Sequence, residues 1–484
     1  MADGASRRVV VVGGGVGGLA TALALGRAGH RVTVLERDRV PDGADPDEVF
    51  AAERRGAPQS HQTHGFLART LTVLRARFPD VLADLHAAGC TTLPSTLHLG
   101  DPQPGDEDLA VLTMRRTTFE WVLRRAVARE PGVVVRSGAG VDGLEAGDPS
   151  AGAPDAVPPT VTGVRLGDGT RFAADIVVVA TGRRDNLVPW LADLGVAVDE
   201  TVRESGLVYL SRWYRLPAGA TVGLDPKLGG DLGYVKYLGV PGDGGSLSIT
   251  LAVPVADGEM RSALGDPERF DLACRLLPGP DQFFVHGPLE PVGGVRPMGG
   301  LINRRRRFLD AAGEPMALGV HAVGDAHTCT NPLYGRGCSL ALVQAVLLAD
   351  ACAAHPGHPA GRAVAYEQAC RAQVEPWFDL AVQTDAAGSD PTGFPADAPP
   401  SPQARAMTAL FVAGETDPVI GRALARLWNL LALPADLAAD PVVAGRMLAV
   451  MSDPDAYPPP PRQGPSRAEL LTALTTDQET TAHA

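Results

Sequence analysis

Runs of consecutive apolar residues, each closed by glycine, dominate the first part of the chain. Val9–Val12 is an unbroken β-branched run, typical of a strand buried on both faces. A glycine cluster separates it from an alanine- and leucine-rich segment with helical spacing, and a second apolar run follows at 31–35. The pattern therefore predicts strand, turn, helix and strand in succession.

Three further runs return to the same pattern. Val133–Val135, the segment 175–180 and the segment 315–324 each have the composition of a buried parallel strand. A long apolar helix is predicted from Gly337 to Asp350. A β-ribbon is predicted in three short pieces, at 139–145, 161–166 and 169–173, interrupted by a low-complexity loop at 147–159.

Between residues 186 and 295 the pattern changes to alternating apolar and polar positions, which predicts an antiparallel sheet. We therefore expect an α/β fold: a Rossmann-like dinucleotide-binding domain with an inserted antiparallel β-sheet substrate domain and a C-terminal helical region. The predicted divisions are 1–185 and 296–355 for the two parts of the first domain, 186–295 for the insert, 356–455 for the helical region, and 456–484 for a proline-rich flexible tail.

Composition narrows the class of protein. The chain has 484 residues, 45% of them hydrophobic, and a formal net charge of −13, which disfavours nucleic acid and anionic membranes as partners. Neither an N-terminal signal segment nor a membrane span is expected, so we predict a cytoplasmic protein. The six cysteines lack C-x-x-C spacing, and we expect neither a metal site nor disulfides.

The first turn carries a G-x-G-x-x-G pattern at Gly13, Gly15 and Gly18. The first glycine permits the tight turn, the second lets backbone approach a pyrophosphate, and the third lets the helix pack on the strand. Glu36, at the end of the second strand, lies where a carboxylate binds an adenosine ribose, which favours FAD or NAD over NADP. The alternative is a structural turn. Two neighbours complete the predicted cofactor-binding set here: Gly17 and Arg37.

More cofactor contacts are expected from three later positions. Arg115 or Arg116, just before a predicted helix, is placed to pair with a phosphate, although either is equally explained as a surface charge. Gly182 closes a buried strand where backbone can approach a cofactor, and Asp325 can bind the hydroxyls of a second ribose or a ribityl chain. At the start of the long helix predicted from Gly337, free backbone amides would face an anion. The residues expected to bind it are Gly335, Arg336 and Gly337.

A cluster of polar residues, 59–64, precedes an amphipathic helix. A plain helix cap needs only one such residue. We expect the loop to lie along the cofactor and to offer Gln59 and His64 to the ring or the substrate, with His64 exchanging a proton near neutral pH. The alternative is that the cluster only caps the helix.

Three ordered motifs together resemble the FAD-dependent monooxygenases of the para-hydroxybenzoate hydroxylase superfamily, whose FAD domain is of the GR2 type. They are the glycine pattern with Glu36, the strand ending at Gly182, and Gly324-Asp325 followed by the loop 332–337. By this resemblance Glu36 holds the adenosine ribose, Arg115 or Arg116 the phosphates, and Asp325 the ribityl and pyrophosphate region. Pro332 and its loop would lie beside the isoalloxazine, as a catalytic wall opposite His64 and Gln59.

The resemblance implies an enzyme that inserts one atom of dioxygen into a hydrophobic small molecule, by hydroxylation or epoxidation through a flavin C4a-hydroperoxide. It is most similar to bacterial natural-product tailoring oxygenases and epoxidases. NADH or NADPH would be a transient reductant, or a separate flavin reductase would supply electrons. The W-x-W-x-I-P pattern of flavin-dependent halogenases is absent. Two alternatives remain: a dehydrogenase or reductase of the same fold, and a non-catalytic flavin-binding protein.

Overall fold

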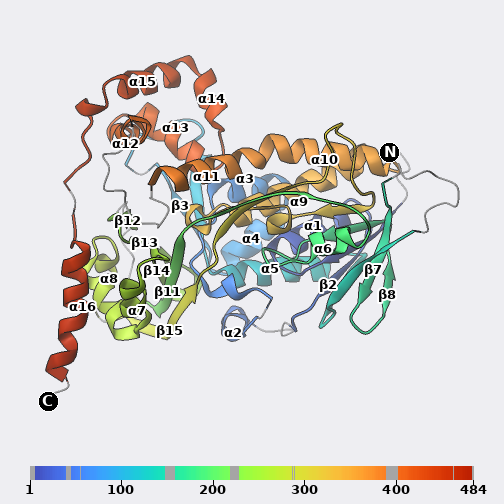
Figure 1. The fold of residues 1–484 in the computed structure, drawn as a ribbon, viewed down its shortest axis with the longest axis horizontal. Helices are drawn as coiled ribbons and strands as arrows, with labels where there is room; N and C mark the ends of the chain where they lie inside the picture. Colours follow the sequence, from blue (N-terminus) through green and yellow to red (C-terminus); the bar gives the residue numbers. More distant parts are fainter. Residues whose placement is uncertain are drawn as a thin grey trace.

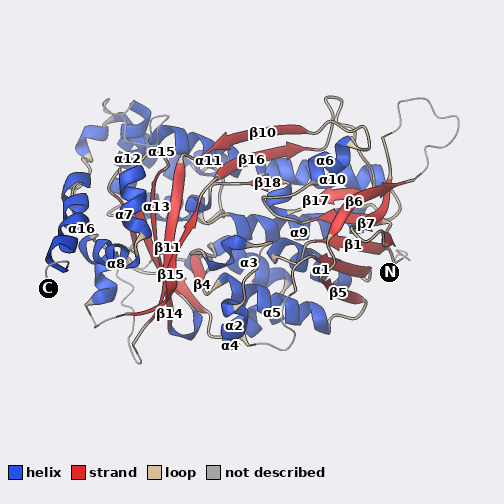
Figure 2. Cartoon of the chain, turned by 60° about the horizontal axis from the view of Figure 1, so that its bottom comes forward, coloured by secondary structure: helices blue, strands red, loops and turns tan. Residues whose placement is uncertain are grey.

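The computed structural model describes residues 6–39, 45–54, 56–96, 98–147, 158–217, 228–285, 287, 289–388, 402–461 and 463–481. Its centre is a five-stranded parallel sheet in the order β17-β9-β1-β2-β5 (Figure 2). Most of the predicted low-complexity loop, 148–157, lies outside the described residues. The sheet strands are β1 (Arg8–Val12), β2 (Arg31–Glu36), β5 (Val133–Ser137), β9 (Ile176–Val179) and β17 (Val320–Ala322).

Alternate residues of β1 serve two separate cores, which explains its unbroken apolar run. Val9 and Val11 pack with the helices on one face, whereas Val10 and Val12 pack with the β-ribbon on the other. Both layers exclude water from the central strand. The helical layer contains α1 (Val16–Arg27), α5 (Arg116–Arg129) and α9 (Gly337–Ala354). The ribbon layer contains β6 (Val141–Ala146), β7 (Val161–Leu166), β8 (Arg171–Ala173) and α6 (Leu187–Ala192).

Helix α9 is long and apolar enough to cross a membrane by length and composition, but 61% of it is buried inside the protein. It packs against α1 and against α10 (Pro359–Gln373). A mostly buried helix between two others is the core helix of a folded domain. Within the described part of the chain, no other helix passes the same test.

The predicted insert forms a second, antiparallel sheet in the order β12-β13-β14-β11-β15. In β11 the side chains of Leu210 and Tyr214 pack on the outer helices, whereas Tyr209, Ser211 and Trp213 face the first domain. The strands are β12 (Gly229–Asp231), β13 (Lys236–Pro241), β14 (Ser246–Pro254), β11 (Leu207–Arg215) and β15 (Glu290–Met298), and the outer helices include α7 (Gly258–Gly265) and α8 (Pro267–Leu276).

The predicted boundary at 295 falls inside β15, which continues to Met298. A small three-stranded sheet, β10-β16-β18, then connects the two domains. Its central strand is rich in arginine, and Arg304 and Arg306 both bind the buried carboxylate of Asp185. The strands are β10 (Asp199–Glu204), β16 (Ile302–Arg307) and β18 (Thr328–Cys329).

The C-terminal helices lie over the end of the second sheet (Figure 1). They are α11 (Glu375–Gly388), α12 (Pro402–Gly414), α13 (Pro418–Trp428), α14 (Pro434–Ala439) and α15 (Pro441–Ser452). The remaining elements support the first domain: α2 (Pro46–Ala51), α3 (Ala68–Arg77), α4 (Pro79–Ala87), and the β3 (Thr91–Pro94) and β4 (Ala110–Thr113) pair.

The prediction of a flexible tail from 456 to 484 is wrong for most of its second half. Helix α16 (Arg467–Thr481) lies beside α7 and α8 (Figure 1). Leu470 and Leu474 are fully buried in the core of the second sheet, and Arg467 forms an ion pair with Asp257 at 2.7 Å. Burial of these two leucines stabilises the helix in its place. The proline-rich composition of the segment did not predict this packing.

One buried ion pair locks the two domains together. Asp243, in the turn between β13 and β14, accepts hydrogen bonds from the backbone N–H of Arg115 at 2.7 Å and from its guanidinium at 2.6 and 3.0 Å. Thr118 Oγ1 donates to the same carboxylate at 2.8 Å. Because Asp243 stands at the N-terminus of α5, the helix dipole also favours its charge.

Asp243→Ala would leave the Arg115 guanidinium buried without its main partner. We expect a loss of about 3–5 kcal/mol in the free energy of unfolding, the usual result of breaking a buried pair from one side. The measurement is urea unfolding followed by circular dichroism. Asp455→Ala, which removes an exposed partner of Arg405, is the control, with an expected loss of about 0–1 kcal/mol. Equal losses of unfolding free energy in the two variants would contradict a stabilising role for the Asp243–Arg115 pair.

Candidate active site

A single cavity of about 1250 Å³ runs from the carboxyl ends of β1, β2 and β9 to the second sheet and the helices α11–α13. Pockets for drug-sized ligands are typically about 300–1,000 Å³. The cavity is therefore large enough for a dinucleotide together with a second molecule. Its position at the carboxyl ends of parallel strands is the usual place for ligands in such sheets.

The glycine turn after β1 forms one end of this cavity. Gly13 has φ +107°, and a Cβ there would lie 2.5 Å from the carbonyl oxygen of Ala180. A Cβ on Gly18 would lie 1.9 Å from the carbonyl oxygen of Gly13. In contrast, Gly15 lines the cavity, and apart from its chain neighbours the nearest atoms to a Cβ there would be side-chain atoms of Arg116 and Glu120, at 3.9 Å. Two glycines thus close the turn, and the third leaves room for a ligand.

Two helix N-termini face the cavity without a side-chain cap. Helix α1 begins after Gly15 and helix α9 after Arg336, and neither has an acidic residue in its first turn. The first amides of an uncapped helix have no partner within the helix, and its dipole favours an anion. Two such ends in one cavity form a donor set that suits the phosphates of a dinucleotide.

Glu36 is held firmly at the wall of the cavity. Its carboxylate accepts hydrogen bonds from the backbone N–H of Gly14 at 2.7 Å and of Asp38 at 2.8 Å. Arg54 adds a third contact to Glu36, at 3.3 Å. These contacts fix the carboxylate beside the glycine turn, where the sequence predicts the ribose site.

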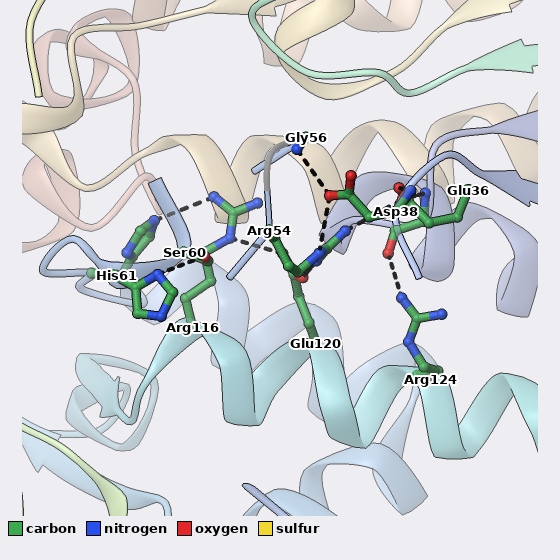
Figure 3. Close-up of polar contacts among 11 residues, drawn as sticks. Glu36, Asp38, Arg54, Gly56, Ser60, His61, Arg116, Glu120 and Arg124 are labelled. Atoms are coloured by element: carbon green, nitrogen blue, oxygen red, sulfur yellow. Dashed lines mark hydrogen bonds and ion pairs between the residues drawn. The ribbon is translucent and has the colours of Figure 1, made fainter. Parts of the chain in front are cut away.

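Arg54 begins a chain of buried charges that continues along the cavity (Figure 3). Its guanidinium also binds Glu120, which in turn accepts from Nε of Arg116 at 2.9 Å. Although burial alone would raise the pKa of Glu120, Arg54 and Arg116 hold it below its usual value. Arg116 lines the cavity, so its positive charge is available there while Glu120 fixes its position.

His64 completes this chain as a neutral ring. Its Nδ1 lies 2.9 Å from the carbonyl oxygen of Gln62, which only accepts, so Nδ1 carries the proton. Nε2 then accepts a hydrogen bond from Arg116 at 3.3 Å. Burial, together with the charge of Arg116, lowers the pKa of His64 to about 3. The structure therefore disagrees with the expected proton exchange by His64 near neutral pH.

The loop that carries Gln59 and His64 is docked on the second sheet. Trp213 Nε1 donates to the carbonyl oxygen of His61 at 2.6 Å, and Ser211 Oγ donates to the side chain of Gln62 at 2.6 Å. Gln59 and His64 both line the cavity. The cluster 59–64 thus does more than cap a helix, because its other members bind the two domains to each other.

Asp325 lies at the start of a short 3-10 turn after β17 and faces the cavity. Burial raises the pKa of its carboxyl group, although Arg116, Arg304 and Arg183 oppose this effect. Among the described residues, Arg304 donates to the backbone carbonyl of Asp325, and no hydrogen bond is donated to its carboxylate. A half-buried carboxylate in the cavity wall without a protein donor is suited to the hydroxyls of a ligand.

The loop 331–337 is braced by a network centred on Asp385 of α11. Its carboxylate accepts from the hydroxyl of Tyr334 at 2.5 Å and from the side-chain amides of Asn331 at 3.0 Å and Asn303 at 2.7 Å. Tyr209 of the second sheet donates to Asn331 at 2.8 Å. The network joins all three parts of the chain at the loop that the sequence placed beside the flavin.

The cavity brings together most of the site residues predicted from the sequence. Two do not line it: Gly18 packs against the turn, as expected for the third glycine, and Arg115 is committed to Asp243 and Asp47. Of the two candidate arginines, only Arg116 remains available to a phosphate. The predicted residues that line the cavity are Gly13, Gly15, Gly17, Glu36, Arg37, Gln59, His64, Arg116, Gly182, Asp325, Pro332, Gly335, Arg336 and Gly337.

Sequence reasoning missed Arg54, Glu120 and Asp385. Glu120 lies four residues after Arg116, so the helical i,i+4 spacing was a usable signal. Arg54 and Asp385 lie far in sequence from their partners, and nothing in their local composition distinguishes them from surface charges.

Residues 8–46 match the family model described as FAD dependent oxidoreductase. No curated protein sequence matches the chain. The solved structures that it resembles include PqsL of P. aeruginosa in complex with 2-aminobenzoylacetate, with a TM-score of 0.56 and 18% identity over 79% of this chain and 95% of that one. The p-nitrophenol 4-monooxygenase PnpA from Pseudomonas putida gives 0.59 and 19% over 89% and 99%, and the flavin-dependent brominase Bmp2 gives 0.61 and 17% over 94% and 100%.

The chain has the fold of the FAD-dependent monooxygenases. The expected fold class and the resemblance of the motifs to FAD-dependent enzymes are thereby confirmed. At identities below one fifth, the likeness to these structures shows the fold alone. The chemistry of this chain depends on the residues of its own cavity.

The lowered pKa of His64 predicts how the free energy of unfolding depends on pH. Between about pH 3 and 6.5 the unfolded ring binds a proton that the folded ring does not, so this group stabilises the fold less as the pH falls. Between pH 7 and pH 5 we expect wild type to lose about 2 kcal/mol more in the free energy of unfolding than His64→Gln. Urea unfolding of both proteins at both pH values measures this, and a pH-independent difference between them would contradict the assignment.

Proposed function

We propose that the protein is an FAD-dependent monooxygenase acting on a hydrophobic small molecule. The observation that carries this proposal is one continuous cavity with two different ends. Uncapped helix N-termini and buried charges form the dinucleotide end, and the second sheet and C-terminal helices form the other end. A redox cofactor and an organic substrate would meet inside it.

The residues of the first end fit FAD. Glu36 would hold the adenosine ribose, the first amides of α1 with Arg116 the pyrophosphate, and Asp325 the ribityl chain. The free space beside Gly15 is where a pyrophosphate has to approach the backbone. When bound and reduced, FAD supplies the electrons that activate dioxygen for transfer of one oxygen atom.

The uncapped start of α9 has a second role. Its amides, at Gly337 and the following residues, present a fixed positive dipole to the cavity beside the loop 332–335. Such a preorganised dipole stabilises negative charge on a reduced cofactor without reorganisation of the protein. The Asp385 network keeps the loop in place, because three donors converge on one carboxylate.

An apolar cluster beside the loop 332–335 limits the access of water to this part of the second end. Leu207, Tyr209 and Met298 of the second domain form an apolar cluster with Leu333 of the loop, and each of them lines the cavity. A dry site protects a reactive intermediate from hydrolysis and strengthens polar interactions around it. Nothing in this end requires an acid or base that titrates near pH 7, which agrees with a neutral His64.

We also propose a source of electrons for the flavin and a cellular compartment for the protein. A single glycine pattern leaves no separate domain for NADH or NADPH, so we propose a transient visit by one of them or electrons from a separate flavin reductase. All six cysteines are free and buried, which suits a reducing compartment, and we propose the cytoplasm. Natural-product biosynthesis is the proposed setting, since a hydroxylase or epoxidase with an apolar cavity suits polyketides and terpenoids.

Bromination is not part of the proposal. Bmp2 is a flavin-dependent brominase, but its 17% identity shows a shared fold only. The W-x-W-x-I-P pattern has no counterpart in this sequence.

The test uses FAD-loaded protein reduced chemically in the absence of air. We expect mixing with dioxygen to reoxidise the flavin and to release hydrogen peroxide when no substrate is present. With ¹⁸O-labelled dioxygen and a mixture of neutral polyketides, terpenoids and polycyclic aromatics, mass spectrometry should find one labelled oxygen atom in a product.

Failure of the reduced flavin to react with dioxygen would contradict the proposal. A product that has gained or lost hydrogen without labelled oxygen would instead identify a dehydrogenase or reductase. Binding of FAD with neither reaction would identify a non-catalytic flavin protein.

A further inference from the structure

Helix α12 carries apolar residues on two faces. One face, with Ala406, Leu410 and Ala413, is buried against α13 and α15. Ala404, Met407 and Phe411, at helical spacing of three and four residues, line the cavity together with the polar residues Gln403 and Thr408. A surface helix normally has a polar outer face, so apolar side chains outside the packed face are suited to contact a ligand.

Exposed apolar side chains of α12 and of other elements line the same cavity. Phe411 is 50% exposed, Trp428 44%, Leu238 38% and Met407 37%, and all four line the cavity. They come from three separate elements, β13, α12 and α13. We call these four residues the apolar clamp. Exposed apolar groups that converge on one cavity are typical of a binding site rather than of scattered surface residues.

The clamp is continuous with the wall beside the cofactor end. The Trp428 ring packs edge-on against Tyr334, with ring centroids 6.0 Å apart. Tyr334 belongs to the loop braced by Asp385. A molecule with its reacting end beside this loop would reach the clamp with its other end.

Charge at this end disfavours an ionic ligand. Lys236 is the only cation that the second sheet and α11–α13 contribute to the described cavity wall, and it is paired with Asp231. The carboxylate of Asp385 is occupied by Tyr334, Asn331 and Asn303. The wall therefore offers apolar contact without a free charge.

We propose that the apolar clamp determines the substrate class: an elongated, uncharged molecule whose apolar part extends from the loop 332–335 to Phe411 and Trp428. This inference rests on the proposed function, since it assigns the outer end of the same cavity. It makes β13, α12 and α13 the elements that select the substrate.

The test measures binding of a series of 1-alkanols, from 1-butanol to 1-decanol, to the FAD-loaded protein by calorimetry. For chains that reach the clamp, we expect each added methylene to tighten binding about fourfold in wild type. Met407→Ser/Phe411→Ser should leave the shortest alcohols unaffected and weaken the longest about tenfold or more. Both side chains are exposed, so the fold should survive their replacement.

Leu448→Ser is the matched control. Leu448 is 65% exposed on α15 and does not line the cavity, so this variant should bind every alcohol as wild type does. Wild-type affinity that is independent of chain length, or an equal chain-length dependence in the double variant, would overturn the clamp. Either result, obtained with normal FAD content and normal reaction with dioxygen, would leave the proposed function standing. A wild-type protein that does not bind FAD would instead refute the proposed function.

Discussion

Three backbone segments meet around Gly13 at distances that no side chain permits. The end of β1, the start of α1 and the end of β9 converge there, so that a Cβ on Gly13 would lie 2.5 Å from Ala180 and one on Gly18 would lie 1.9 Å from Gly13. This close approach fixes where α1 begins. The position of α1 in turn fixes where its first amides and Glu36 face the cavity. Arg54 binds Glu36, and the chain of side chains that ends at His64 starts from this contact.

The other walls of the cavity are held to this turn by contacts between the domains. Asp243 binds Arg115 at the start of α5. The next residue of the same helix, Arg116, lines the cavity, and Glu120, one turn later, holds its guanidinium. On the other side, Trp213 and Ser211 hold the loop 59–64. The substrate sheet is thus fixed to the elements that position the cofactor end, and α11 is joined to both through Asp385.

The sequence was informative where one local segment determines the structure. The βαβ turn, the strand ending at Gly182 and the start of α9 all follow from consecutive residues, and so does the glycine whose missing side chain opens the cavity. Local pattern could not choose between Arg115 and Arg116, since the choice depends on Asp243, more than a hundred residues away.

Tertiary packing decided the remaining features. Helix α16 is held in place because Leu470 and Leu474 pack in the core of the second sheet. The composition of the proline-rich tail does not predict this contact. The lowered pKa of His64 comes from its burial and from the charge of Arg116, neither of which the polar cluster in the sequence reveals. The apolar clamp is assembled from β13, α12 and α13, and no single segment carries its signature.

The central claim is that the space beside Gly15 belongs to the pyrophosphate of a non-covalently bound FAD. The direct measurement is the cofactor released from purified protein, identified by mass spectrometry and counted per chain, in wild type, Gly15→Val and Gly445→Val. Gly445, on α15, is the control, because among the described residues a Cβ there would meet no atom within 4 Å beyond its own stretch of helix, and the residue is outside the cavity. The account predicts one FAD per chain in wild type and in Gly445→Val, and none in Gly15→Val; full FAD content in Gly15→Val, or a different cofactor in wild type, would contradict it.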